Sequence, residues 1–216
     1  MVQDDSEMFS SKKKSSSAKK GFDVEGCESL FNSFADVEDP DIISMDGIQH
    51  IGEQLDIDPS SDVKILVICW KLGAVSKPGC ITRTEFLKAM ESMNFNSISA
   101  IKDALPTFDP GFLEDREFRE FFRFVFQFSR EGTHKTIEKE MASGLLSLVL
   151  DLNRAPHLNQ FIEFLGNCSH TRITLDQWDS FLQFNSAYDV SLSNYDEDGA
   201  WPILLDEYVE WRKREK

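Results

Sequence analysis

Residues 115–130 place apolar side chains three and four positions apart, and nearly all of them are aromatic. The members of this stripe are Phe118, Phe121, Phe122, Val125, Phe126 and Phe128. This spacing puts the side chains on one face of an α-helix. A helix with so large an apolar face has to bury it, so the stripe predicts an aromatic core packed from helices. The 18 phenylalanines of the chain point the same way.

The helical period continues along most of the chain beyond residue 40. Further helices are expected at 61–72, from Thr82, at about 137–151, 156–166 and 175–186, and from Pro202 to about Trp211. Two of them open with a capping box, in which the first and fourth side chains satisfy each other's backbone donors. These boxes are Thr82 with Glu85, and Thr174 with Gln177. No convincing β-branched alternation or Asn-Gly hairpin interrupts the pattern, so the expected fold class is all-α.

Three regions are expected along the chain. Residues 1–20 hold six Ser and five Lys with few large apolar residues, which predicts a disordered tail. Its clusters Lys12–Lys14 and Lys19–Lys20 resemble a nuclear localisation signal, so the nucleus and the cytoplasm are the expected locations. Pro106, Pro110 and Gly111 interrupt the helices, which divides the remainder into lobes at 21–108 and 109–216.

Composition excludes several classes of function. No apolar run reaches the roughly 18–20 residues of a membrane helix, and no secretory signal is present, so a soluble protein is expected. The net charge of −15 argues against nucleic acid and favours either a basic protein partner or simple solubility. The four cysteines are scattered, and Cys69 and Cys168 fall in apolar helical stretches, which predicts buried free thiols.

Two segments have the outline of calcium-binding loops without the oxygen ligands. In Asp36–Gly47, the central Gly is replaced by Asp41 and the last acid by Gly47. In Ala74–Glu85, the last acid is present, but Ala, Ser and Pro occupy the first three ligand positions. An EF-hand-like pair without metal is therefore expected, and a degenerate calcium sensor remains an alternative.

The sequence offers few candidate catalytic residues or motifs. No nucleophile elbow, Gly-rich phosphate loop or metal-ligand pattern occurs, and Cys80 has no evident activating partner. No enzyme, catalytic residue, metal or cofactor is expected.

The segment from Ile173 to Trp211 has nine acidic residues and no Lys, Arg or His. Within it, Asp176 opens one helix and Asp206 lies one turn into the next, while the small Ala200 precedes that second helix. Two acids around a small apolar dimple suit a partner that carries Arg or Lys. The alternative is that Tyr195 and Trp201 merely pin two helices together.

The run Asn194-Tyr-Asp-Glu-Asp-Gly-Ala-Trp-Pro-Ile-Leu-Leu-Asp-Glu-Tyr-Val-Glu210 closely resembles the defective-in-cullin-neddylation family, whose globular unit is a cullin-binding domain. The resemblance covers about residues 25–211 and is also carried by Asp176-Gln-Trp178, Asp46-Gly-Ile48, Trp70-Lys71, Glu85-Phe86, Phe126-Gln-Phe128 and Leu148-Val-Leu150.

This resemblance implies a two-lobed helical protein, EF-hand-like in its first lobe and a helical bundle in its second. It implies that Asp176, Ala200 and Asp206 bind the C-terminal winged-helix region of a cullin. It also implies a first-lobe pocket for the acetylated N-terminus of a neddylation conjugating enzyme. The positions matching that pocket are Ile65, Ile68, Leu72, Ile81 and Phe128.

The implied function is a monomeric, non-catalytic scaffold that promotes cullin neddylation and touches the ubiquitin-like modifier only indirectly. The alternative to this scaffold, besides the calcium sensor, is a helical nuclear adaptor for another basic partner.

Overall fold

A computed structural model describes residues 22–214 of the chain, so the expected tail at 1–20 lies outside the described residues. Its helices are α1 (Val24–Phe34), α2 (Met45–Gln54), α3 (Lys64–Lys71), α4 (Arg83–Met93), α5 (Ile98–Ala104), α6 (Asp115–Phe128), α7 (Lys139–Val149), α8 (Leu158–Asn167), α9 (Leu175–Ala187) and α10 (Ile203–Arg214). Two short 3-10 helices, η1 (Leu105–Thr107) and η2 (Pro110–Phe112), join α5 to α6. The expected helical class is confirmed.

Local sequence signals fix several helix starts. Both predicted capping boxes are present: Thr82 opens α4 with Glu85, and Thr174 opens α9 with Gln177. Helix α10 begins directly after Pro202, as predicted. Each signal works because a side chain or a proline removes an unsatisfied backbone donor from the first helical turn.

Four short strands escaped the sequence analysis. They are β1 (Ile42–Ile43), β2 (Ile81–Thr82), β3 (Thr136–Glu138) and β4 (Arg172–Thr174). β1 pairs with β2 and β3 with β4, both antiparallel. Strands of two or three residues are too short to show alternation. Each pair joins two helix–strand–helix units, which is the arrangement that the EF-hand-like interpretation requires; that interpretation stays a prediction.

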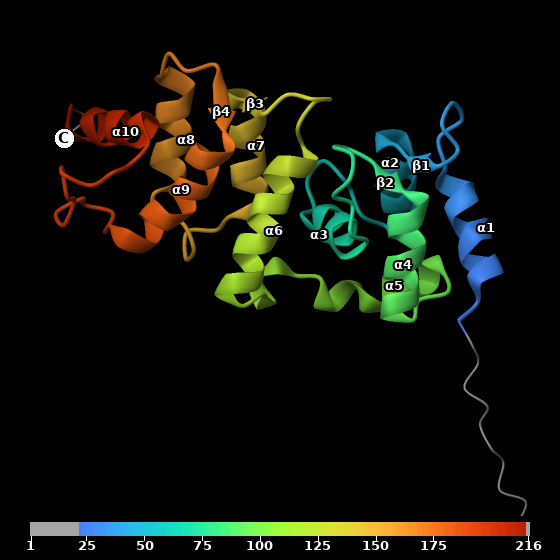
Figure 1. Ribbon diagram of the computed structural model, residues 1–216. Helices are drawn as coiled ribbons and strands as arrows, with labels where there is room; N and C mark the ends of the chain where they lie inside the picture. The colour runs from blue at the N-terminus through green and yellow to red at the C-terminus, as the bar shows by residue number, and fades with distance from the viewer. Residues whose placement is uncertain (1–21, 215–216) are drawn as a thin grey trace, which may run out of the picture.

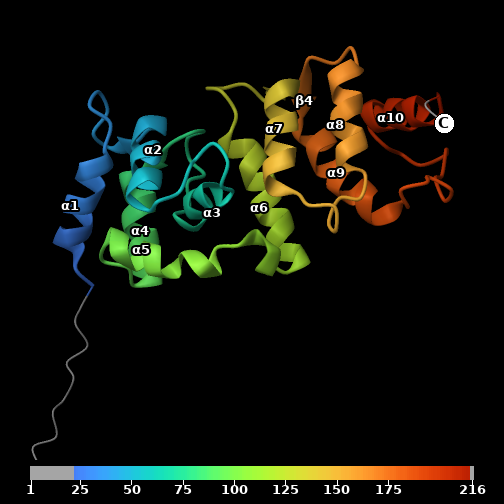
Figure 2. The ribbon, with the colours of Figure 1, turned by 180° about the vertical axis from the view of Figure 1, so that it is seen from behind.

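The helices form an elongated row (Figures 1 and 2). α1, α2, α4 and α5 lie at one end, α8 to α10 lie at the other, and α6 stands between them. α6 contacts α3 on one side and α7 and α9 on the other. The predicted boundary near residue 108 falls between η1 and η2. Because α6 contacts both sides, the division into two lobes stays a prediction.

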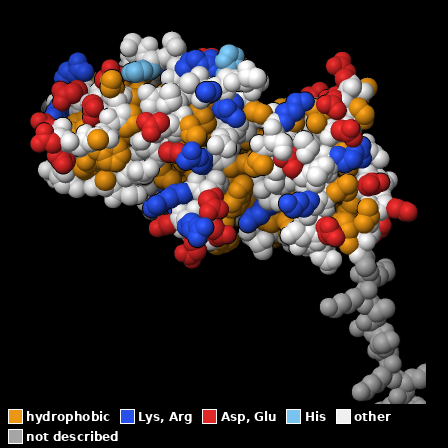
Figure 3. Space-filling model, in the orientation of Figure 1, with side chains coloured by type: hydrophobic (Ala, Val, Ile, Leu, Met, Phe, Trp, Pro, Cys, Tyr) orange, Lys and Arg blue, Asp and Glu red, His pale blue; other side chains and the backbone are white. Residues whose placement is uncertain are grey.

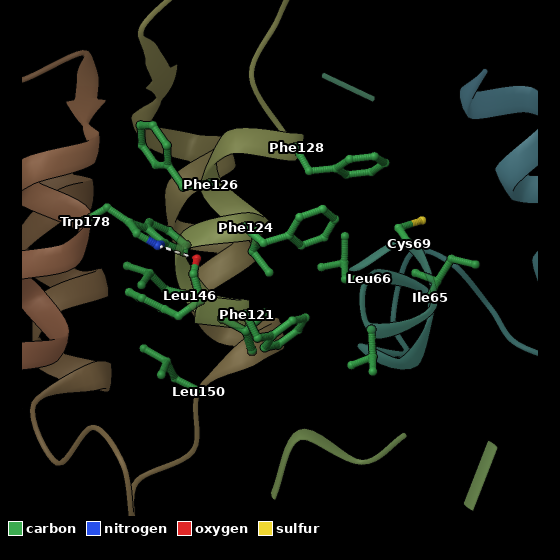
Figure 4. Packing of buried hydrophobic residues seen from close by; sticks show 14 of the residues in the cluster. Ile65, Leu66, Cys69, Phe121, Phe124, Phe126, Phe128, Leu146, Leu150 and Trp178 are labelled. Atoms are coloured by element: carbon green, nitrogen blue, oxygen red, sulfur yellow. Dashed lines mark hydrogen bonds between the residues drawn. The ribbon is translucent and has the colours of Figure 1, made fainter. Parts of the chain in front are cut away.

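The aromatic stripe of α6 is the centre of the core, as expected. Its Phe side chains at 118, 121, 122, 124, 126 and 128 are all buried. Phe122 stacks on Trp178 of α9 with ring centroids 4.5 Å apart, and the indole N–H of Trp178 donates to the carbonyl of Phe122 at 2.9 Å (Figure 4). Phe121 packs against Trp70 of α3 with ring centroids 5.6 Å apart. One helix therefore holds both ends of the molecule together.

The thiols follow the sequence expectation only in part. All four cysteines are free, and Cys27 and Cys69 are buried. Cys80 and Cys168 are only partly buried. The expectation of burial is wrong for Cys168 because this residue is the C-terminal cap of α8 rather than part of its apolar face. Within residues 22–214, no helix combines the length and the apolar character needed to cross a membrane.

Candidate binding surfaces

The first candidate surface lies at the α9–α10 end of the molecule. Asp176 is exposed in the first turn of α9, Ala200 is exposed before α10, and Asp206 is half-buried in the first turn of α10. Negative side chains are favourable at helix N-termini, so both acids are stabilised where they stand. Figure 3 shows acidic side chains gathered around an apolar area at this end. Ile203, the first residue of α10, is 70% exposed.

Asp206 is more constrained than the sequence suggested. Of the three residues, Asp206 is the one that is not fully exposed. The hydroxyl of Tyr195 donates to its Oδ1 at 2.8 Å, and this contact covers part of the carboxylate. Burial, followed by this donation, raises the pKa of Tyr195 well above its usual range, so the phenol stays protonated and keeps donating.

The connection from α9 to α10 is held by its own polar groups. The Asn194 amide nitrogen donates to the carbonyl of Ala187 at 3.2 Å, and the backbone N–H of Asp189 donates to Asn194 Oδ1 at 3.0 Å. Hydrogen bonds from Ser191 and Ser193 lower the pKa of Asp189 to about 2. The connection is therefore tied to the end of α9.

Two aromatic side chains fix the backbone next to Ala200. The indole N–H of Trp201 donates to the hydroxyl of Tyr188 at 2.9 Å. A Cβ on Gly199 would lie 2.9 Å from Nε1 of Trp201 and 3.1 Å from the carbonyl oxygen of Asp196, so only glycine fits there without a shift. The sequence alternative, that Tyr195 and Trp201 join two helices, describes a real contact. That contact also positions Ala200 and Asp206.

The three predicted surface residues lie on elements in mutual contact, but not all at one point. Ala200 and Asp206 adjoin the aromatic side chains at the C-terminal end of α9, where Phe184 packs on Tyr195 and Trp201. Asp176 is at the other end of α9, about 12 Å along the helix axis from Phe184. His170 contacts Glu207 at 2.7 Å, which joins the start of α10 to the segment before α9.

The acidic segment is partly neutralised by the end of the chain. Lys213 of α10 pairs with Glu197 at 2.7 Å and with Glu210 at 3.0 Å. These contacts raise the pKa of Lys213 and lower that of Glu197. The segment from Ile173 to Trp211 holds no basic residue, and Lys213 lies two residues beyond it, so this pairing could not be seen within that segment.

The second candidate surface is an apolar cavity of about 340 Å³ at the middle of the molecule. Its apolar lining comes from α2, α3, α6, α7 and the connection after α2: Met45, Pro59, Leu66, Phe128, Met141, Leu145 and Leu148. Gly79 also lines it, and its backbone N–H donates to the carbonyl of Phe128 at 2.8 Å. The loop at 73–80 therefore forms part of the wall.

Of the five predicted pocket residues, only Phe128 lines this cavity. Ile65, Ile68, Leu72 and Ile81 are at most 3% exposed and lie in the core. The sequence shows two apolar faces on the helix at 61–72, and the structure turns the face with Leu66 toward α6 (Figure 4). Contact between the four core residues and a ligand would require the core to open; their binding role stays a prediction.

The loops that resemble calcium sites are closed by hydrogen bonds. Glu85 Oε1 accepts from the backbone N–H groups of Val75 and Ser76 at 3.0 and 2.8 Å, and Oε2 accepts from that of Thr82 at 2.9 Å. Burial raises the pKa of Glu85, but these bonds outweigh it and the pKa is lowered. Among residues 22–214, no group of three acidic, His or Cys side chains is placed to hold a metal ion.

Comparison with known proteins finds a matching family and several similar proteins. Residues 100–211 match the model of a family described as cullin binding. The chain is 33% identical over 194 residues to DCN1-like protein 4 of Danio rerio, covering 90% of this chain and 68% of the relative. It is 28% identical over 196 residues to DCN1-like protein 4 of Drosophila melanogaster, covering 91% and 78%. It is 29% identical over 197 residues to DCN1-like protein 5 of Homo sapiens, covering 91% and 81%.

Proposed function

The chain belongs to the cullin-binding family of DCN1-like proteins, and from this membership we propose that it binds a cullin and promotes attachment of a ubiquitin-like modifier to it. The observation that carries the proposal is that the family match at 100–211 contains Asp176, Ala200 and Asp206. The partner region would be the C-terminal winged-helix region of the cullin.

The chemistry of the acidic surface supports a basic partner. Asp176 and Ala200 are exposed, and Asp206 is held by Tyr195 with one carboxylate oxygen engaged. A carboxylate whose position is already fixed loses little freedom on binding. Ile203, three residues before Asp206 on α10, is exposed and adds an apolar side chain near this acid, and protein interfaces combine apolar and polar side chains.

We propose that the apolar cavity binds the acetylated N-terminus of the conjugating enzyme. Its lining contains two charged residues, the half-buried Arg130 and the exposed Glu131. A free terminal ammonium group would be costly to bury there without a partner, whereas an acetylated terminus carries no charge. The apolar walls suit a Met side chain.

The protein would position its two partners and would not itself take part in the bond-making steps of modifier transfer. Binding both partners raises the effective concentration of the modifier thioester near the cullin lysine. Three of the four thiols, those of Cys27, Cys69 and Cys80, support this division of labour. Burial raises the pKa of Cys69 to about 12 and also raises the pKa of Cys27 and Cys80, so these groups are poor nucleophiles at neutral pH.

A modifier-transfer assay tests the proposal. Purified cullin C-terminal domain, conjugating enzyme loaded with modifier and this protein are mixed, and modified cullin is measured over time. The protein should accelerate transfer with acetylated conjugating enzyme and less with the unacetylated form. No acceleration with any cullin would reject the scaffold function; equal acceleration with both forms would reject only the role of the acetyl group.

We also propose that the Lys12–Lys14 and Lys19–Lys20 clusters direct part of the protein to the nucleus. Changing these five lysines to Ser in a fluorescent fusion should reduce nuclear accumulation while cullin binding is retained. An unchanged distribution would remove this assignment.

A further inference from the structure

Two methionines stand on different walls of the apolar cavity and are open to solvent. Met45 begins α2 and is 59% exposed, and Met141 lies in the first turns of α7 and is 36% exposed. We propose that Met45 and Met141 form a peroxide-sensitive modification site that controls occupancy of the cavity. The inference rests on the proposed binding of an acetylated N-terminus there.

The placement of these two thioethers distinguishes them from the other described methionines. Both side chains line the same cavity of about 340 Å³, facing Leu66, Phe128 and Leu148. A Cβ on Gly79 would lie 3.7 Å from Sδ of Met45, so this sulfur lies against the cavity wall. Met90, in contrast, is completely buried in the core.

The chemistry needs only a peroxide as oxidant. The thioether sulfur attacks one oxygen of hydrogen peroxide, and the S–O bond forms as the O–O bond breaks. The second oxygen leaves as hydroxide and takes the proton of the attacked oxygen, which gives water. The sulfur loses two electrons to give a sulfoxide, which is polar and is reversible by methionine sulfoxide reductases.

A sulfoxide on either wall opposes an apolar ligand. Its oxygen needs a hydrogen-bond donor, and the cavity walls are mainly apolar, with Ser129 and Arg130 as the lining residues whose side chains can donate. When an apolar side chain of the ligand packs against the sulfoxide, the sulfoxide oxygen loses its hydrogen bond to water and gains no replacement. We expect peptide affinity to fall roughly 5- to 150-fold on oxidation.

The test measures peptide affinity before and after dilute hydrogen peroxide. An acetyl-Met peptide matching the conjugating-enzyme N-terminus is the probe, and peptide mapping by mass spectrometry follows oxidation at each methionine. Met45 and Met141 should oxidise well before Met90, and wild-type affinity should fall and then recover with the reductase. The Met45→Leu/Met141→Leu double variant should show an affinity ratio near one across the treatment, whatever its starting affinity.

A matched control separates this site from general oxidation. Met93 is partly buried on α4 and does not line the cavity, so Met93→Leu should lose affinity on oxidation as the wild type does. All variants keep the four cysteines, which removes thiol oxidation as the cause. Unchanged affinity with both methionines oxidised would overturn the inference alone, as would slow oxidation at both positions. Failure of the untreated protein to bind the peptide would reject the cavity assignment itself.

Discussion

Asp206 is positioned before any partner arrives. Tyr195, eleven residues earlier, donates to Oδ1 of this carboxylate at 2.8 Å. The second carboxylate oxygen, Oδ2, makes no hydrogen bond with any residue in the range 22–214. A charged partner can therefore use an oxygen whose direction is already set, which lowers the ordering cost of binding.

Asp206→Asn is the cleanest test of the cullin-binding surface. The amide oxygen can still accept from Tyr195, so the fold is retained while the charge is lost. Removing one member of a buried charge pair at an interface costs about 2–5 kcal/mol, which is roughly a 30- to several-thousand-fold loss of affinity. Calorimetric titration with the cullin C-terminal domain gives the affinity, and a thermal melt gives the stability.

Glu197→Gln is the matched control for that variant. Glu197 lies in the same acidic segment but pairs with Lys213, and the pair is exposed, so affinity should change little. Asp206→Lys is less informative, because its ammonium would face the Tyr195 hydroxyl in a half-buried position. A folded Asp206→Asn variant with wild-type affinity would end the assignment of this residue.

His157 should make stability depend on pH. Its side chain is completely buried between α8, α9 and α10, with Nδ1 3.0 Å from the Tyr208 hydroxyl and Nε2 3.3 Å from the Tyr188 carbonyl. Burial lowers its pKa from 6.5. The unfolded chain therefore binds more protons below pH 6.5, so stability is full above that pH and falls as pH decreases.

Urea unfolding at a series of pH values measures this contribution. Below pH 6.5, one such group removes at most about 1.4 kcal/mol of stability per pH unit. His157→Asn cannot titrate, so its stability should decrease less than that of the wild type between pH 7.5 and 5.5. Parallel curves for the two proteins would show that His157 makes no difference.

At the scale of elements, the sequence predicts features that depend on neighbouring residues. It does not predict features that depend on contacts between distant segments. The capping boxes at Thr82 and Thr174 depend on residues three apart, and both are present. The strands of two and three residues form only because distant loops pair, which no local pattern announces. In the same way, tertiary packing selects the face of α3 that carries Leu66, so the cavity could not be derived from helical spacing alone.

Glu85 closes the loop at 74–85 with hydrogen bonds. Its two carboxylate oxygens accept from the backbone of Val75, Ser76 and Thr82 and from the Thr82 hydroxyl. Glu85→Gln puts an NH2 group against some of these donors, which should cost about 1–3 kcal/mol. Because its pKa is lowered from 4.5, this stabilisation is present above pH 4.5 and is lost as pH falls below it.

Urea unfolding with and without calcium tests this role. Glu91→Gln is the control, because Glu91 is an exposed acid on the same helix and should matter little. Calcium should leave the wild-type midpoint unchanged. A calcium-dependent increase in stability would favour the sensor interpretation over a loop closed by Glu85.

At the scale of the whole molecule, the two candidate surfaces share no residue. The acidic surface is built from α9, α10 and their connection, and the cavity from α2, α3, α6, α7 and nearby loops. The core of α6 packs against both α3 and α9, so it joins them through buried aromatic side chains. Two proteins bound at these surfaces would be held in a fixed relation.

A scaffold of this kind predicts a bell-shaped dose response. With cullin and loaded conjugating enzyme held scarce, transfer should first rise with added protein. Once the protein greatly exceeds both partners, each partner binds a different copy, and transfer should fall because the effective concentration is lost. A catalyst that acts on one substrate at a time would instead give a plateau.

The two surfaces should influence this curve separately. Asp206→Asn weakens only the cullin side, so its maximum should be lower and lie at higher protein concentration than that of the wild type. Leu145→Glu places a charge in the cavity wall and should weaken only the peptide side; circular dichroism checks its folding. A plateau that persists for wild-type protein in large excess over both partners would contradict simultaneous binding, because only a bridging protein is inhibited by its own excess.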